Sequence, residues 1–410
     1  MTFSANGRPY AAPARRTLAV CIDGTAPAYL EDALARGLVP RLSSLLDGEG
    51  RLLAARAQVP TLTNVNNASI VTGVSAARHG VAGNHYLAPD GEERQLTDPA
   101  ALRAETILAA ARRAGVGVLA VTAKDKLRDL LGAGGVPSIS AERAHEQTLP
   151  DLDGRTGVDV AGPNPDIYDP ALSVYAIDLA LALAGELGAT LVYCSLTDYV
   201  QHAAAPGEAM ADAFLEALDA RLGGALDAGW LVGMVADHGM NPKPEVRYLG
   251  DALDAAGVSG ARVVLPITDP YVVHHGALGS LAHAYVEPDH LPLARATLAV
   301  IPGVEGVLAR AAAARAFDLP EDRIGDLVVL GDRDTALGGW ADRHDLSGLR
   351  GALRSHGGLH EQAVPLVLSA PLRREHEGRE LRNADLFDLL LNGVDASRAA
   401  GAGGRAEASA

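Results

Sequence analysis

Four short apolar runs along the chain have the length and composition of buried β-strands. They are TLAVCID at 17–23, GVGVLAVTAK at 115–124, ATLVYCSL at 189–196 and WLVGMVA at 230–236. Each run is almost continuously apolar, which is typical of strands that are covered on both faces. Helical spacing of apolar residues separates them, at 99–114, 170–187 and 209–229. This alternation predicts an α/β fold with a mostly parallel central sheet flanked by helices.

The remaining pattern divides the chain into a core and an insertion. RLLAARAQV at 51–59 and VPLVLSA at 364–370 add two strands, and a last helix is expected at 383–392. From about Pro244 the pattern changes to short strands that alternate with small helices, which indicates an inserted α+β cap. We therefore predict a loose leader, a core in two parts, a cap and a disordered tail, at 1–16, 17–243 with 346–395, 244–345 and 396–410.

Charge and composition narrow the class of function. The 410 residues include 35 basic and 51 acidic ones, for a net charge of −16, which argues against nucleic acid or an anionic membrane as partner. Cys21 and Cys194 lie inside apolar runs and are expected to be core thiols in a reducing compartment. We find neither a signal core in residues 1–16 nor a membrane span, so a cytoplasmic protein is expected. The sequence leaves the oligomeric state open, a homodimer included.

A hydroxyl nucleophile is predicted in the stretch VPTLTNVNNASIVTGVSAARHGVAGNH, residues 59–85. Thr63 stands where a loop enters a helix, beside backbone N–H groups that have no partner within the helix. Such a helix start suits a phosphoryl or other oxyanion group. Asn84 follows in a glycine-containing turn that could bring an amide back over Thr63. The alternative is an ordinary capped helix.

Acids and imidazoles follow the predicted strands and form a candidate metal site. In chain order they are Asp23, Asp198, His202, Asp237, His238 and His356. The carboxyl edge of an open α/β sheet is where ligands bind, and a spacing of four residues places Asp198 and His202 on one helical face. Six such ligands suit a two-metal hydrolytic site, and carboxylate and imidazole without thiolate favour zinc or a similar first-row ion. The alternatives are that Asp23 and Asp198 cap helices and that His202 is merely exposed.

Lysine is scarce in this chain, with only Lys124, Lys126 and Lys243 among the 35 basic residues. Lys124 and Lys126 are one residue apart at the end of a predicted strand, where they would share one side if the chain stayed extended. Their spacing suggests a need for compact ammonium groups at this edge. A solvated charge cluster with neighbouring Asp125, Arg128 and Asp129 is the alternative.

Taken together, these motifs resemble the alkaline phosphatase superfamily, close to its nucleotide pyrophosphatase/phosphodiesterase branch. The resemblance covers residues 17 to about 395. The segments that carry it are TNVNNASIVTG, the GN pair at 83–84, AKDK, TDYVQH, ADHGMN and RSHGG. Within the superfamily, the chain looks most like the enzymes that hydrolyse the carbon–phosphorus bond of phosphonoacetate.

The resemblance implies two zinc ions and assigns their ligands. One zinc would be held by Asp198, His202 and His356. The other would be held by Asp23, Asp237 and His238, with Thr63 bridging toward it. Thr61 and Ser69 are the local rivals of Thr63, and His360 is the rival of His356.

The resemblance also implies a reaction. Thr63 would attack phosphorus and form a phosphothreonine that water later hydrolyses, while Asn84 holds the phosphoryl oxygens. Lys124 and Lys126 would bind the carboxylate of a small-molecule phosphonate and stabilise the charge that moves onto it as the bond breaks. The alternatives are a phosphodiesterase or nucleotide pyrophosphatase with the same metals, or a catalytically dead metal-binding module.

Overall fold

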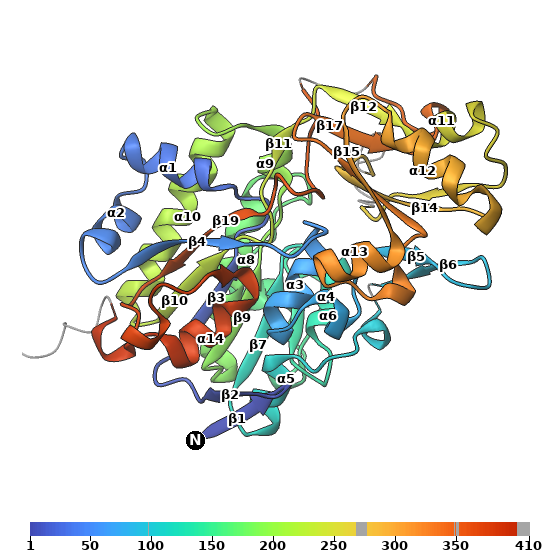
Figure 1. The fold of residues 1–410 in the computed structure, drawn as a ribbon. Helices are drawn as coiled ribbons and strands as arrows, with labels where there is room; N and C mark the ends of the chain where they lie inside the picture. Colours follow the sequence, from blue (N-terminus) through green and yellow to red (C-terminus); the bar gives the residue numbers. More distant parts are fainter. Residues whose placement is uncertain (97, 268–276, 348, 350–351, 400–410) are drawn as a thin grey trace, which may run out of the picture.

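The computed structural model describes residues 1–96, 98–267, 277–347, 349 and 352–399. Its core is an eight-stranded mixed sheet with helices on both faces (Figure 1). The strands occur in the order β20 (Leu381–Arg382), β4 (Arg51–Arg56), β19 (Ala363–Leu368), β10 (Leu231–Val235), β3 (Thr17–Cys21), β9 (Leu191–Ser195), β7 (Val118–Thr122) and β8 (Ser138–Ser140). The predicted fold class is confirmed, with β19 as the antiparallel member.

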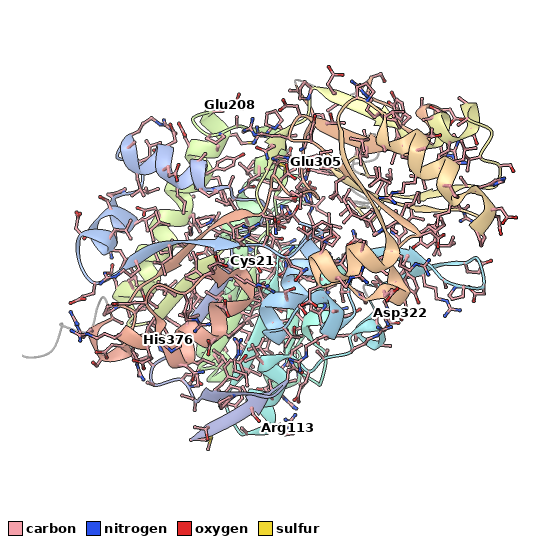
Figure 2. The ribbon with its side chains drawn as sticks, viewed as in Figure 1. Cys21, Arg113, Glu208, Glu305, Asp322 and His376 are labelled. Atoms are coloured by element: carbon pink, nitrogen blue, oxygen red, sulfur yellow. The ribbon has the colours of Figure 1, made fainter. Side chains whose placement is uncertain are left out.

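Two layers of helices bury the sheet. One face carries α1 (Pro27–Ala35), α2 (Pro40–Asp47), α8 (Ala171–Leu187) and α10 (Ala209–Asp227). The other carries α3 (Thr63–Thr72), α5 (Ile107–Arg113) and α14 (Leu386–Asp388). All residues of β3, β7, β9 and β10 are buried, which explains why these segments are apolar throughout. Both cysteines are free and buried, and Cys21 lies deep in the core (Figure 2).

The register of the parallel strands places their ends level with one another. Cys21 of β3 pairs with Val235 of β10 and with Ser195 of β9, and Ser195 pairs with Thr122 of β7. Parallel strands that end level release the following residues at one edge of the sheet. The residues two or three positions further on are therefore neighbours in space, although they come from distant parts of the sequence.

A second, smaller unit stands beside the core. Its four-stranded antiparallel sheet has the order β13 (Arg262–Val264), β14 (Leu281–Tyr285), β16 (Leu327–Gly331) and β15 (Val304–Ala309). It is packed against α11 (Leu249–Ala255) and α12 (Leu291–Ala299), with a separate apolar cluster (Figure 1). The chain leaves the core through β11 (Asn241–Pro242) and returns through β18 (Arg354–Ser355), and these two short strands pair. The cap expected at 244–345 falls between them.

The prediction of a loose leader is wrong. Residues 1–16 contain a hairpin of β1 (Thr2–Ala5) and β2 (Arg8–Ala11). Phe3 and Tyr10 are buried in the core and their rings stack at 5.6 Å, so apolar contacts hold the hairpin in place. The Ala, Pro and Arg content hid this short two-stranded pattern.

Two expectations at the C-terminus also change. The helix expected at 383–392 is a succession of a 3₁₀ turn at Asn383–Asp385, the short α14 and a π-helix at Leu389–Gly393. The tail expected from 396 begins with an ordered 3₁₀ turn at Ala396–Arg398. Residues 400–410 of that tail, like His274 and His275, lie outside the described residues.

Within the described ranges, we find no helix that combines the length and apolarity needed to cross a bilayer. Beyond the sheets already given, two further strand pairs occur among the described residues. They are β5 (His85–Leu87) with β6 (Glu93–Gln95), and β12 (Glu245–Tyr248) with β17 (Thr335–Gly338).

His283 on β14 gives the fold a testable pH dependence. Burial lowers the pKa of His283 to about 3, assisted by His85 and Arg310, and neither ring nitrogen has a hydrogen-bond partner among the described residues. The unfolded chain binds the proton near pH 6.5, so the stability contributed by neutral His283 is present above that pH and is lost as the pH falls toward 3.

We expect His283→Leu to flatten the decline of unfolding free energy between pH 6 and 4, by up to about 1.4 kcal/mol per pH unit. Denaturant titrations at several pH values measure this slope. His145→Gln at the exposed surface is the control and should keep the wild-type slope. An unchanged slope in His283→Leu would contradict the assignment.

Candidate metal centre and nucleophile

The level strand ends deliver the predicted acids to one place. Asp23 stands two residues beyond Cys21, and Asp237 stands two beyond Val235. Asp198 follows β9 by three residues and precedes α9 (Tyr199–Ala203), which carries His202. The three carboxylates are 0–4% exposed. Residues that are far apart in the sequence thus become neighbours in the site, because the parallel strands before them end level.

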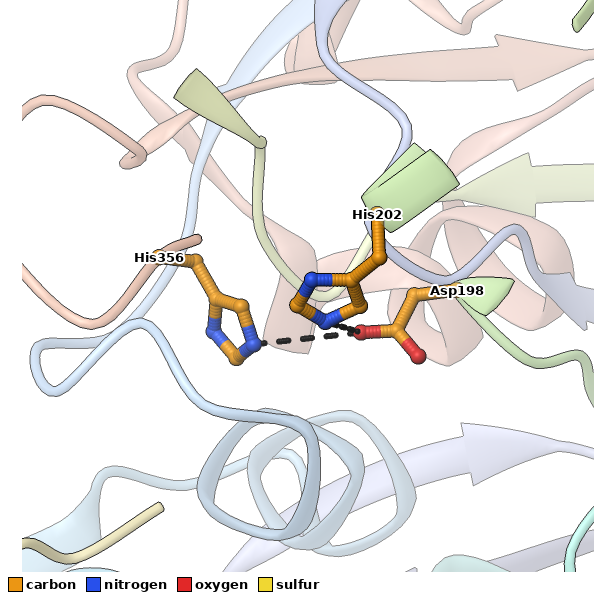
Figure 3. A group of neighbouring side chains, drawn as sticks. All are labelled: Asp198, His202 and His356. Carbon is orange, nitrogen blue, oxygen red and sulfur yellow. Dashed lines mark ion pairs between the residues drawn. The ribbon is translucent and has the colours of Figure 1, made fainter. Parts of the chain in front are cut away.

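Asp198, His202 and His356 form one cluster of potential ligands (Figure 3). The Nε2 atom of His202 lies 2.9 Å from Oδ2 of Asp198, and Nε2 of His356 lies 3.8 Å from the same oxygen. His356 reaches this position from the loop after β18, whereas the other two come from the end of β9 and from α9. The three residues predicted to share one zinc therefore do converge.

A second cluster surrounds His238. Its Nε2 atom lies 3.4 Å from Oδ1 of Asp23, 3.6 Å from Oδ2 of Asp237 and 3.3 Å from Oγ1 of Thr63. Asp198 also comes within reach, since potential ligand atoms of Asp23, Asp198 and His238 all lie within 4.8 Å of one another. The two clusters are thus adjacent, and Asp198 lies between them.

The three histidines are all oriented in the same way. Nδ1 of His202, His238 and His356 contacts the carbonyl of Arg354, Gly239 and Thr61, respectively, at 2.7–2.9 Å. A carbonyl can only accept, so each Nδ1 carries the hydrogen and each Nε2 keeps a lone pair. This arrangement fixes the tautomer that a metal ligand requires and turns all three Nε2 atoms toward the acids.

The buried carboxylates carry negative charge that nearby protein groups neutralise only in part. Burial raises the pKa of Asp23 well above its usual range, and the charges of Asp198 and Asp237 raise it further. Burial also raises the pKa of Asp198, but His202 and Lys124 outweigh this effect and hold it well below the usual range. Oδ1 of Asp23 has no hydrogen-bond partner among the described residues. These carboxylates and imidazoles fit divalent cations of the zinc type.

The expected nucleophile lies against the second cluster. Thr63 is the first residue of α3, and Leu62 before it provides no side-chain cap. The first N–H groups of α3 therefore point, together with the positive end of its dipole, at the space beside Oγ1. A tetrahedral oxyanion would suit this position.

The rivals of Thr63 and His356 are engaged in structural contacts. The Thr61 hydroxyl donates to Gly358 O and accepts from Gly357 N–H, at 2.9 Å each. Ser69 donates to Val65 O and contacts His79. His360 is paired at 2.8 Å with Glu305 of the cap (Glu305 is labelled in Figure 2).

The helix-cap alternatives are also excluded by the structure. The N-cap of α1 is Ala26, and Asp198 at the start of α9 makes no side-chain capping bond.

Lys124 and Lys126 do not lie on an extended segment, so the expected placement on one side of a strand does not apply. Helix α6 (Asp125–Leu131) begins between them, so Lys124 is its N-cap and Lys126 lies in its first turn. Nζ of Lys124 is 3.5 Å from Oδ1 of Asp198, at the first cluster. Lys126 lies close enough to His85 to lower the pKa of that imidazole, although burial is the larger cause. Asp125 between them bonds Arg128, Ser140 and Gln147 and faces away.

Asn84 directly precedes His85, so Lys126 and the Asn84 turn lie in the same region. The backbone of Asn84 is fixed by Pro266 O and Leu96 N–H at 2.9 and 2.8 Å. Its predicted role over Thr63 remains a prediction.

One supporting residue was missed by the sequence analysis. Asn67 lies one turn after Thr63 and donates to Thr63 O at 3.0 Å and to Oδ2 of Asp237 at 3.5 Å. Its own oxygen accepts from the Tyr193 hydroxyl at 2.7 Å, which fixes the amide orientation. The spacing of four from Thr63 was the available signal, since it places both residues on one helical face.

This sheet, with acids and imidazoles at its carboxyl edge and a threonine at a helix start, defines an alkaline phosphatase-like protein. The chain belongs to the type I phosphodiesterase / nucleotide pyrophosphatase family, whose sequence profile matches residues 17–357. The resemblance expected from the motifs is thereby confirmed.

Solved structures refine this placement. Phosphonoacetate hydrolase from Sinorhizobium meliloti 1021, crystallised with phosphonoformate and with phosphonoacetate, is 41% identical. The match covers 95% of this chain and 98% of that one, with a TM-score of 0.89. Murine ectonucleotide pyrophosphatase/phosphodiesterase 5 shares the fold at 17% identity over 92% of this chain and 94% of its own, with a TM-score of 0.64.

Removing the charge of Asp23 should have opposite effects in the metal-free and the zinc-saturated protein. In protein stripped of metal, Asp23→Asn should raise the Tm because it relieves repulsion from Asp198 and Asp237. With saturating zinc it should lower the Tm, because a stabilising ligand is lost. Calorimetry under both conditions measures this, with exposed Glu380→Gln as the control. The same direction in both conditions would contradict a cation site at Asp23.

Proposed function

We propose that this protein hydrolyses the carbon–phosphorus bond of phosphonoacetate to acetate and phosphate at a site with two zinc ions. The observation that carries the proposal is the 41% identity to a phosphonoacetate hydrolase over 95% of the chain. The convergence of the site residues supports it. Asp198, His202 and His356 would hold one zinc, and Asp23, Asp237 and His238 the other.

Zinc at these ligands would lower the pKa of a neighbouring hydroxyl and neutralise the phosphoryl oxygens. Thr63 then attacks phosphorus, helped by its position at the start of α3. The P–C bond breaks, and its electron pair moves to the methylene carbon as a phosphothreonine forms. Proton transfer to that carbon gives acetate, and water hydrolyses the phosphothreonine to release phosphate and restore Thr63.

The carboxylate of the substrate makes carbon a feasible leaving group. The electron pair spreads into the carboxylate as an enediolate, and nearby ammonium groups stabilise this charge more in the transition state than in the ground state. Lys124 already lies beside Asp198, at the first cluster. Lys126 emerges from the same end of α6, and Asn84 would hold a phosphoryl oxygen.

Purified protein loaded with zinc should release acetate and inorganic phosphate from phosphonoacetate in equal amounts, and a chelator should abolish the reaction. Thr63→Ala should lower kcat at least about a thousandfold, since the nucleophile is lost. An aryl phosphodiester assayed in parallel tests the alternative. Faster turnover of the diester would favour a phosphodiesterase, and full zinc occupancy without turnover would favour a binding module.

The two lysines should act selectively on the carboxylated substrate. Lys124→Ala and Lys126→Ala should each lower kcat on phosphonoacetate by about 10²- to 10³-fold, as expected for loss of a donor to a developing anion. Any turnover of an aryl phosphodiester should change little. Arg128→Ala removes a cation from the same helix and is the matched control. Wild-type rates in both lysine variants would contradict the carboxylate role.

A further inference from the structure

The third lysine lies in a buried ion pair behind the metal ligands. The side chains of Lys243 and Glu361 are both 0% exposed, and Nζ lies 2.9 Å from Oε1. Two charges removed from water at this depth carry a large desolvation cost, and replacing such pairs by apolar residues is often neutral or stabilising. The pair is therefore poorly explained as a device for stability alone.

Glu361 connects the loops that carry two of the metal-site histidines. Its Oε1 accepts from the Asn241 side chain at 2.8 Å and its Oε2 from Gly358 N–H at 3.1 Å. Its backbone carbonyl accepts from Gly239 N–H at 2.8 Å. Gly239 and Asn241 follow His238, whereas Gly358 follows His356 by two residues. One residue thus holds both loops.

The two histidines are in direct contact at the centre of the site. Their rings stack with centroids 3.7 Å apart and planes inclined by 8°. His238 belongs to the second cluster and His356 to the first. The separation of these rings therefore sets the separation of the two candidate cation positions.

Lys243 supplies the counter-charge and a link to the cap. Besides Glu361, Nζ donates to Arg333 O at 2.7 Å, in the turn between β16 and β17. Its backbone N–H donates to Leu353 O at 2.7 Å, just before β18. The ammonium is enclosed by one carboxylate and one carbonyl, so it neutralises Glu361 without facing the substrate.

We propose that Glu361 is a positioning residue that fixes the spacing of the His238 and His356 loops, with Lys243 as its counter-ion and its connection to the cap. This inference rests on the proposed zinc site, because it concerns the geometry that two cations need. A partner behind the ligands that orients them typically changes metal affinity by about 10- to 100-fold.

The test compares zinc affinity with stability in a double-mutant cycle. Zinc dissociation constants are measured by competition with a chelating dye, and the Tm of metal-free protein is measured in parallel. The variants are Glu361→Leu, Lys243→Met and their combination. Leu253→Ala, in the separate apolar cluster of the cap, is a control that destabilises the protein without touching either histidine loop.

Each single variant should lower the Tm because it leaves an unpaired buried charge or an unsatisfied partner. The double variant should recover most of the Tm but keep a zinc dissociation constant at least about tenfold weaker than wild type. Leu253→Ala should lower the Tm and leave zinc affinity unchanged. Recovery of both properties in the double variant would overturn the inference and leave a structural ion pair.

Asn241→Ala keeps the test decisive if the charge variants fail to fold. It removes one donor to Glu361 from a partly exposed position and leaves the ion pair in place. We expect a severalfold loss of zinc affinity with a Tm no lower than that of Leu253→Ala, and unchanged affinity would overturn the inference. Absence of zinc binding by wild-type protein would instead overturn the proposed function together with the inference.

Discussion

Asp23, Asp198 and Asp237 are almost fully removed from water, and like charges at this spacing repel one another unless cations lie between them. Protein groups relieve this repulsion at Asp198, whose pKa is lowered, but not at Asp23, whose pKa is raised. Imidazoles and one lysine compensate the first cluster. In the second cluster, Oδ1 of Asp23 is left without a hydrogen-bond partner among the described residues.

Backbone carbonyl groups around the acids orient the imidazole rings of the three histidines. Three carbonyls fix the Nδ1 side of three histidines, so that every Nε2 faces the acids. The carbonyl of Thr61 belongs to this set, and its hydroxyl bonds Gly357 and Gly358, which follow His356. Thr61, which the sequence offered as an alternative to Thr63 as nucleophile, therefore orients the candidate metal ligand His356 instead. Orientation of ligands in this way is as important to a metal site as the ligands themselves.

The three lysines lie in two distinct environments in this fold. Lys124 and Lys126 lie at the N-terminal end of α6, where they would contact an anionic substrate. Lys243 is buried with Glu361 behind the histidines. The excess of acid over base makes the local charge at α6 more relevant than the charge of the whole molecule. The cap contributes a carbonyl to the buried lysine and Glu305 to His360, so it is tied to the core at loops that also carry the site.

Much of the fold and of the candidate site could be predicted from the sequence, because continuous apolar strands and the polar residues directly after them are local features. The run before Asp23 and the run before Asp237 predict a buried parallel sheet whatever their order in space. The hairpin at residues 1–16 could not be predicted, since its two short strands are stabilised by Phe3 and Tyr10 packing against distant segments. Local patterns were therefore enough to predict the fold class and the chemical types of the side chains at the sheet edge. The level strand ends at Cys21, Val235 and Ser195, the place of Asp198 between two clusters and the joining of two histidine loops by Glu361 became visible in the folded chain alone. Strand register and loop contacts depend on residues far apart in the chain, so no local pattern contains them.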